Sequence, residues 1–170
     1  ANAGRVRGTD VYYAEGSNNG QRAAYIIADN FKDIYPLPDR VRTLATTRLA
    51  EVTRTRAPAV LVEIAYHDNV DDADWIAENI PAIARNLSQS VTDYFGLPFV
   101  DPIPVQNGVV TTGGGNLNVR AYPSTDGTVI GSVPSGGVVQ VRGRYEDWYV
   151  IDYNGLLGYA NSRYIRIEGV

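Results

Sequence analysis

The segment 57–69, with the sequence APAVLVEIAYHDN, decides how the first half of the chain is organised. Residues 59–62 form a continuous apolar run of strand length, which is typical of a buried strand in a parallel or mixed sheet covered on both faces. The run ends at Glu63. Because ligands of open α/β sheets bind outside the carboxyl ends of the strands, Glu63 is a candidate functional residue.

Strand and helix patterns alternate around this segment. Residues 10–13 (DVYY) are β-branched and aromatic, which favours a strand, and residues 23–34 repeat apolar side chains with helical spacing behind a cap at Ser17 or a following Asn. Acidic residues at 71–72 begin another helical pattern, and Pro81 begins a further one. The order strand, helix, strand, helix, helix predicts an α/β fold.

The chain changes character near residue 100. Three prolines within residues 98–104 predict a semi-rigid linker, because proline fixes φ and holds its predecessor extended. Beyond them, residues 116–120 alternate with a period of two, and Asn154-Gly155 between two β runs is a strong hairpin signal. These short strands predict a small all-β barrel. The expected boundaries are a first domain at 1–97, a linker at 98–112 and a second domain at 113–168.

Composition excludes several classes of protein. The chain has 170 residues and a net charge of −4, which argues against a nucleic-acid partner because phosphates require a basic face. No apolar run approaches the roughly 20 residues of a membrane span, so no membrane partner is expected. The chain has no Cys and one His, which excludes thiolate sites and any site that needs two imidazoles from this chain.

Several motifs together resemble those of zinc-dependent N-acetylmuramoyl-L-alanine amidases. Residues 57–69 are similar to the family's glutamate motif, Pro-Ala-x-Leu-x-Glu followed by Gly, an aromatic residue, a variable pair and Asn. Residues 1–3 (ANA) and 8–13 (GTDVYY) are similar to its His-x-Asn-Ala and Gly-x-x-Val-Tyr-Tyr segments. The chain departs from the pattern at Ala65 and His67. The resemblance covers roughly residues 1–96 and implies the C-terminal part of a mixed-sheet amidase domain.

The second half resembles a bacterial SH3-like domain. The motifs that carry this resemblance are LNVR at 117–120, WY at 148–149, NGLLGY at 154–159 and SRYI at 162–165. Such modules commonly accompany cell-wall hydrolases and bind peptidoglycan, so the resemblance implies bacterial peptidoglycan as a partner. Tyr122, Trp148 and Tyr159 are candidate wall contacts, although each is equally suited to filling a small core.

The amidase resemblance also implies one Zn²⁺ ion, with no metal ligand in this chain. Aligning residues 1–3 with His-x-Asn-Ala places the family's zinc-binding His one position before Ala1, and the other ligands further upstream. The expected partner is therefore the N-terminal fragment of the same amidase domain. A carboxylate beside a catalytic zinc moves the proton of its bound water, and we assign that role to Glu63 rather than a solvated or salt-bridged one. Asn2 either orients the neighbouring His or occupies a turn.

Three further features have structural interpretations that outweigh functional ones. His67 follows Glu63 by four residues, but a strand pattern precedes it, so a solvent-facing or locally hydrogen-bonded His is favoured over a ligand; a substrate contact stays open. The acidic cluster between 68 and 74 lacks the spacing of a Ca²⁺ loop and suits a helix start. Five arginines between 40 and 56 favour a solvated face over a site for stem-peptide carboxylates.

Together these inferences predict a secreted hydrolase of the bacterial cell wall. The complete enzyme is expected to cleave the amide between N-acetylmuramic acid and the L-Ala of the stem peptide with zinc-activated water, while the SH3-like module holds it at the wall. This chain alone is expected to be incomplete. The alternative is a catalytically inert peptidoglycan-binding fragment that acts through the SH3-like module.

Overall fold

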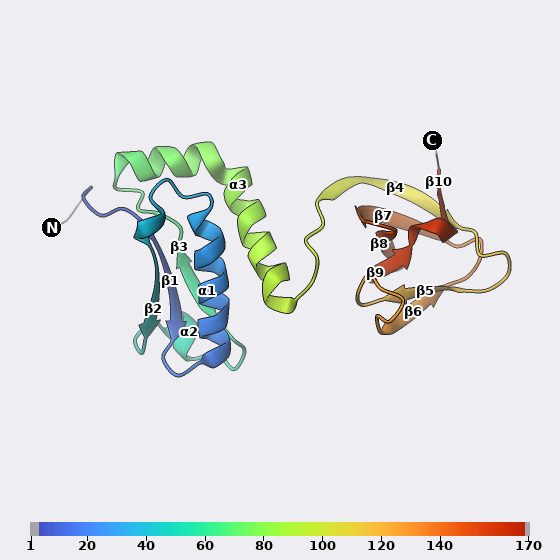
Figure 1. The fold of residues 1–170 in the computed structure, drawn as a ribbon, viewed down its shortest axis with the longest axis horizontal. Helices are drawn as coiled ribbons and strands as arrows, with labels where there is room; N and C mark the ends of the chain where they lie inside the picture. Colours follow the sequence, from blue (N-terminus) through green and yellow to red (C-terminus); the bar gives the residue numbers. More distant parts are fainter. Residues whose placement is uncertain (1–3, 169–170) are drawn as a thin grey trace. The chain divides into compact units, whose positions relative to one another are not determined.

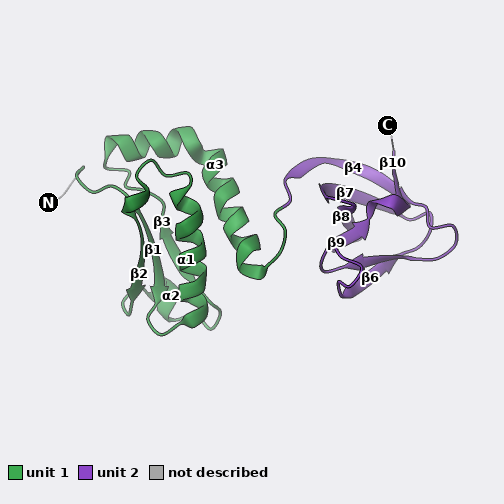
Figure 2. Cartoon of the chain, viewed as in Figure 1, with its two compact units in different colours: residues 1–99 green, residues 100–170 purple. Residues whose placement is uncertain are grey.

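The computed structural model describes residues 4–168, which divide into two compact units between Phe99 and Val100 (Figure 2). The first unit is α/β and the second is all-β, as the sequence predicts (Figure 1). Asn2 lies outside the described residues. No helix of the described part of the chain is long and apolar enough to cross a membrane.

The first unit is built on a three-stranded sheet of order β2-β1-β3. The central strand β1 runs parallel to β2 and antiparallel to β3. The strands are β1 (Thr9–Ala14), β2 (Val41–Thr46) and β3 (Val60–Glu63), and the helices are α1 (Asn18–Lys32), a single 3-10 turn (Pro38–Arg40), α2 (Ala50–Thr53) and α3 (Val70–Phe95).

Helices α1 and α3 pack on one face of this sheet. Val11 and Tyr13 of β1 belong to the same buried core as Phe31 of α1 and Trp75 of α3. The alternate β1 residue Tyr12 points to the opposite face and is only half-buried. The prediction of a β3 covered on both faces is therefore wrong: β3 is an edge strand of half-buried residues, because the two long helices share one side.

The helix ends follow from the sequence. The Ser17 hydroxyl accepts from the Gly20 amide at the start of α1, and the Asn69 side chain does the same for the amide of Asp72 at the start of α3. The two helical patterns at 71–95 form one helix with a break at Asn79, two residues before Pro81, because proline removes a hydrogen bond and disfavours helical geometry just before it.

The second unit is a seven-stranded antiparallel sheet of order β10-β4-β7-β8-β9-β5-β6. Its apolar core includes Val119, Val141 and Ile151. A hairpin with Asn154 and Gly155 at positive φ joins β8 to β9. The strands are β4 (Pro102–Val110), β5 (Leu117–Arg120), β6 (Val129–Val133), β7 (Val138–Tyr145), β8 (Trp148–Tyr153), β9 (Leu156–Asn161) and β10 (Ile165–Ile167), with a 3-10 turn at Ser162–Tyr164.

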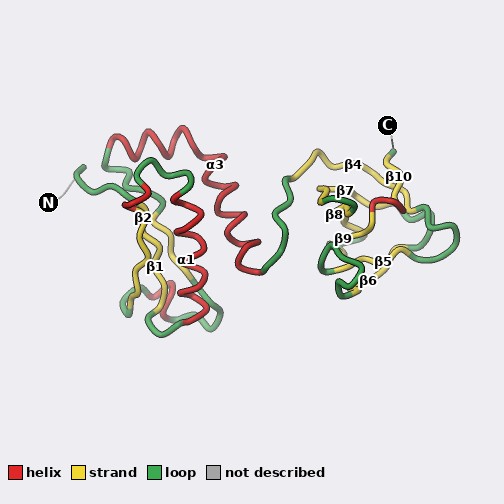
Figure 3. The backbone as a smooth tube through the Cα atoms, in the orientation of Figure 1, coloured by secondary structure: helices red, strands yellow, loops and turns green. Residues whose placement is uncertain are grey.

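Strand β4 occupies much of the stretch for which the sequence predicts a linker (Figure 3). Residues 106–109 pair with β7, whereas Pro102 is separated from that pairing by a register shift. A proline is tolerated at the start of a strand because its missing N–H is not required there, so a proline-rich stretch does not exclude β structure.

Candidate functional site

Glu63 ends β3 on the face of the sheet opposite the α1–α3 core. It lies directly across from Asp10 in the antiparallel β1–β3 register, and Asp10 is in turn paired with Arg42 in the parallel β1–β2 register. Side chains at directly opposed positions share a face, so Arg42, Asp10 and Glu63 form one row across the three strands. The row places two carboxylates side by side at one end of the sheet.

The Asp10 carboxylate is buried and fully engaged. Arg42 donates to it in a bidentate arrangement, with Nε 2.7 Å from Oδ1 and Nη2 2.8 Å from Oδ2. The Tyr66 hydroxyl donates to Oδ2 at 2.7 Å. Burial, reinforced by the hydrogen bond to Asp10, raises the pKa of the Tyr66 phenol, which therefore remains a proton donor to Asp10 at neutral pH.

Glu63, by contrast, is exposed and makes no side-chain hydrogen bond or ion pair within residues 4–168. Its neighbour Asp10 is neutralised by Arg42, which leaves Glu63 as the free carboxylate of the row. A carboxylate with free lone pairs at a sheet edge is able to accept a proton from water or to hydrogen-bond a ligand.

A second buried carboxylate, Asp72, fixes the loop that follows Glu63. It accepts from the Tyr35 hydroxyl at 2.6 Å and Arg7 Nε at 3.0 Å, and from the amides of Gly8 at 3.2 Å and Tyr66 at 3.1 Å. Burial and the bond to Asp72 raise the pKa of Tyr35 to about 12. Asp72 therefore ties residue 66 to the segment before β1.

The segment 4–8 lies against the same loop. The Gly4 amide donates to Asp68 Oδ2 at 3.0 Å, and the Asn69 side chain donates to the Gly4 carbonyl at 2.8 Å. At the start of β1, the Thr9 hydroxyl donates to the carbonyl of Ile64 at 2.7 Å. The residues that follow the ANA motif are thus held beside the loop that begins at Glu63.

The side chains of the described residues do not fit a zinc site. Residues 4–168 contain no group of three or more His, Cys, Asp or Glu side chains placed to hold a metal ion. His67 is exposed, which agrees with a solvent-facing His, and Asp10 and Asp72 are already saturated by hydrogen bonds. We therefore derive no catalytic step through a metal held by this chain.

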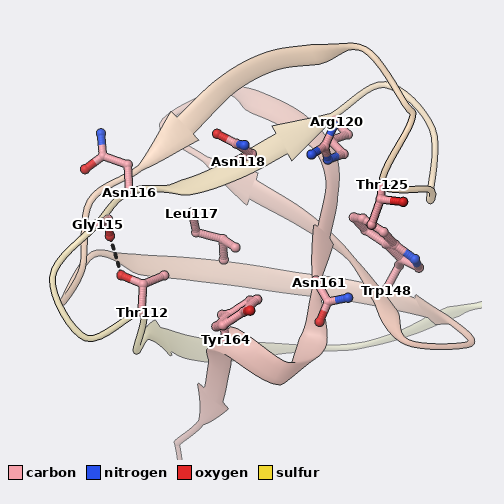
Figure 4. Close-up of a pocket in the computed structure, with 10 residues that line it drawn as sticks. All are labelled: Thr112, Gly115, Asn116, Leu117, Asn118, Arg120, Thr125, Trp148, Asn161 and Tyr164. Carbon is pink, nitrogen blue, oxygen red and sulfur yellow. Dashed lines mark hydrogen bonds between the residues drawn. The ribbon is translucent and has the colours of Figure 1, made fainter.

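The second unit carries a groove of about 450 Å³ between β5, β8 and the turn after β9 (Figure 4). Of the predicted wall contacts, Trp148 lines it, whereas Tyr122 and Tyr159 do not. Burial raises the pKa of Tyr159, which is half-buried. The prediction missed several other lining residues: Asn116, Asn118, Arg120, Asn161 and Tyr164. The period-two alternation of residues 116–120 carried a signal for the first three, because it places them on one side of β5.

Comparisons with known proteins agree with this division. Residues 1–93 match a family model described as N-acetylmuramoyl-L-alanine amidase, and residues 115–166 match one described as bacterial SH3 domain. A search of curated proteins gave no match.

Among solved structures, the chain is similar to the catalytic domain of CD27L, an endolysin targeting Clostridia difficile, with 25% identity and a TM-score of 0.47 over 53% of this chain and 48% of that one. The chain thus spans about half the length of that endolysin domain. NlpC2 and NlpC1 from Trichomonas vaginalis each share 22% identity and a TM-score of 0.33 over 37% of this chain, and over 23% and 22% of their own lengths.

Proposed function

This chain belongs to the N-acetylmuramoyl-L-alanine amidase family, and on that basis we propose that it is the part of a secreted peptidoglycan amidase that carries the proton-transfer carboxylate and a wall-binding module. The bond cleaved is the amide between N-acetylmuramic acid and the L-Ala of the stem peptide. Glu63 takes a proton from the attacking water and delivers it to the leaving amine. General acid–base catalysis of this kind contributes about 10²–10⁴-fold.

The observation that carries the proposal is the contrast between Glu63 and Asp10. Both carboxylates lie in one row of the sheet. Asp10 accepts hydrogen bonds from Arg42 and Tyr66, whereas Glu63 is exposed and unpaired within residues 4–168. Glu63 also ends the strand that resembles the family's glutamate motif. A proton carrier requires a carboxylate that no other group of the protein occupies.

Zinc enters the proposal with ligands from a polypeptide outside this chain. That polypeptide would be the N-terminal fragment of the same amidase domain, and two features of the sheet support such a partner. The face with Tyr12 and Glu63 lies opposite α1 and α3, and within the described residues β2 and β3 each pair with a strand on one side alone. Half-covered sheets of this kind bind a further layer or strand. Asn2 would orient the neighbouring ligand.

The proposal is tested on the chain assembled with the polypeptide that supplies the metal ligands. Glu63→Gln is expected to reduce the release of amino groups from purified peptidoglycan by at least about 100-fold, because the amide cannot carry the proton. Zinc content should be unchanged. Glu78→Gln, an exposed acid of α3, is the matched control and should retain full activity. Near-normal hydrolysis by Glu63→Gln would remove Glu63 from the mechanism.

A second candidate function is supported by the second unit itself. Its core is closed and apolar, and its groove lies entirely within residues 112–164, so the module is able to bind peptidoglycan without the first unit. The chain would then be a catalytically inert wall-binding fragment. Intact mass under native conditions with zinc analysis separates the two: a second polypeptide with about one zinc supports the amidase, and a metal-free monomer that binds the wall supports the fragment.

A further inference from the structure

The groove of the second unit combines a neutral polar rim with one cation. Asn116, Asn118 and Asn161 contribute side-chain amides, and Trp148 and Tyr164 contribute aromatic rings (Figure 4). Its volume of about 450 Å³ lies within the range of about 300–1,000 Å³ that is usual for small-ligand sites. Of the lining residues, all within the described chain, Arg120 alone is charged.

The Arg120 guanidinium keeps N–H donors that are available to a ligand. Its Nη1 donates to the Gly127 carbonyl at 2.6 Å, which fixes the guanidinium against the turn after β5. No acidic side chain of residues 4–168 forms an ion pair with it. A guanidinium has five N–H donors in a planar fork that matches a carboxylate. A half-buried cation that is anchored by one bond and lacks an acidic partner favours an anionic ligand.

The aromatic residues of the groove discriminate between ligand classes. Trp148 is 9% exposed, so most of its ring surface is covered and it offers little open face on which a sugar ring can stack. Tyr164 also lines the groove and is 40% exposed. The Asn118 amide presents a donor and an acceptor, which is the complement of a peptide group. Asn161 Oδ1 accepts from the Arg163 amide, which leaves its Nδ2 as the donor, and Asn116 Nδ2 donates to Ser132, which leaves its Oδ1 as the acceptor.

We propose that this groove binds the stem peptide of peptidoglycan, with a peptide carboxylate paired to Arg120 and peptide amides bonded to Asn118 and Asn161. The inference rests on the proposed wall-binding function. Within intact peptidoglycan the lactyl carboxyl of the glycan is consumed in the amide to L-Ala, whereas the stem peptide keeps free carboxylates. The charge of Arg120 therefore selects the peptide over the glycan.

The test titrates the full chain with the synthetic peptide L-Ala-D-isoglutamate-L-Lys-D-Ala by calorimetry, and locates binding from amide NMR shifts. Arg120→Gln is expected to weaken binding by at least about tenfold, because a charge-assisted hydrogen bond is lost. Arg166→Gln removes the same charge from the exposed side of β10 and should change the affinity less than twofold. Since Arg120→Gln also loosens the turn at Gly127, Asn118→Ala is a second variant that leaves this bond intact; we expect it to weaken binding about fivefold.

Three ligands decide the source of the carboxylate. The peptide with its carboxylates amidated should bind at least about tenfold more weakly, and equal binding would overturn the proposal. Free N-acetylmuramic acid, which carries an unblocked lactyl carboxylate, should bind more weakly than the peptide; tighter binding would assign the groove to the sugar and overturn the peptide assignment.

Purified peptidoglycan separates the groove assignment from the wall-binding function on which it rests. If it sediments the chain while the peptide does not bind, the groove assignment fails and wall binding stands; if neither binds, wall binding fails too.

Discussion

The two units of this chain place their polar groups in opposite ways. In the described residues, every buried polar or charged side chain lies in the first unit: Thr9, Asp10, Asp72, Asn86 and Ser90. The buried side chains of the second unit are apolar, and its polar groups rim a surface groove. Buried carboxylates cost desolvation unless they are fully hydrogen-bonded. The first unit therefore satisfies its buried carboxylates with hydrogen bonds that hold particular loops in place, whereas the core of the second unit contains no buried charge among the described residues.

The buried carboxylates of the first unit converge on the surroundings of Glu63. Tyr66 is bonded to both: its hydroxyl donates to Asp10 and its amide donates to Asp72. A satisfied polar network of this kind rigidifies the segments that it joins. Long-range hydrogen bonds thus hold the loop that follows the candidate catalytic acid, whereas strand alternation places the polar residues of the groove in the second unit.

The largest expected difference between the units is their ability to fold alone. Residues 100–170 should give a cooperative thermal transition as a monomer, because the core is closed within them. Residues 1–99 should self-associate, because their sheet has two free edges and one face without a long helix. Analytical ultracentrifugation and circular dichroism of both fragments test this. A sharply melting monomer of residues 1–99 would show that the open face needs no partner.

Next in size is the effect of removing the charge of Asp72. Asp72→Asn leaves Arg7 and two backbone amides without their charged acceptor, and should lower the unfolding free energy of the first unit by about 3 kcal/mol. Asp71→Asn is the matched control, because Asp71 binds the same arginine but is 69% exposed; its loss should cost less than about 1 kcal/mol. Chemical denaturation of both variants checks the difference, and equal losses would contradict a special role for the buried acid.

The two units should also differ in their stability to acid, because of the same buried carboxylate. Burial alone would raise the pKa of Asp72, but hydrogen bonds from Tyr35, Arg7 and the amides of Tyr66 and Gly8 outweigh it and lower the pKa. Because the folded pKa lies below the unfolded value of about 3.9, this stabilisation is complete above the unfolded value and is lost as pH falls through the folded one. Below pH 4 the fluorescence of Trp75 should therefore report unfolding before that of Trp148. Simultaneous transitions would contradict the prediction.

Local patterns in the sequence predicted part of this picture. The apolar run at 59–62 and the helical spacing of residues 23–34 predicted β3 and α1, and Glu63 was identified as the carboxylate at the end of the run. Strand β2 was not predicted, because Arg42 and two threonines interrupt its apolar pattern. Arg42 was interpreted as part of a solvated face, and its side chain is 54% exposed, but its ion pair with Asp10 was not predicted.

The missed contacts share a cause. Asp10 meets Arg42 and Tyr66 across 32 and 56 residues of sequence, a separation at which short-range periodicity carries no information. Likewise, density of aromatic residues did not separate Trp148, which lines the groove, from Tyr122 and Tyr159, which do not. Which of these side chains line the groove could be decided only from the pairing register of β5, β8 and β9.

The smallest expected effect concerns turn geometry in the second unit, where none of the described residues is a buried charge. Gly155 has φ of 86°, a conformation that L side chains rarely adopt, so Gly155→Ala should destabilise the β8–β9 hairpin by about 1–2 kcal/mol. Gly115 has no positive φ, and a Cβ there meets no atom within 4 Å. Gly115→Ala should therefore stabilise the unit by about 0.4–1 kcal/mol, by restricting the unfolded chain. Thermal unfolding monitored at Trp148 measures both changes. Opposite signs are expected because the two substitutions differ in backbone conformation rather than in space, and shifts of the same sign would show that the stability of this unit depends on something other than local turn geometry.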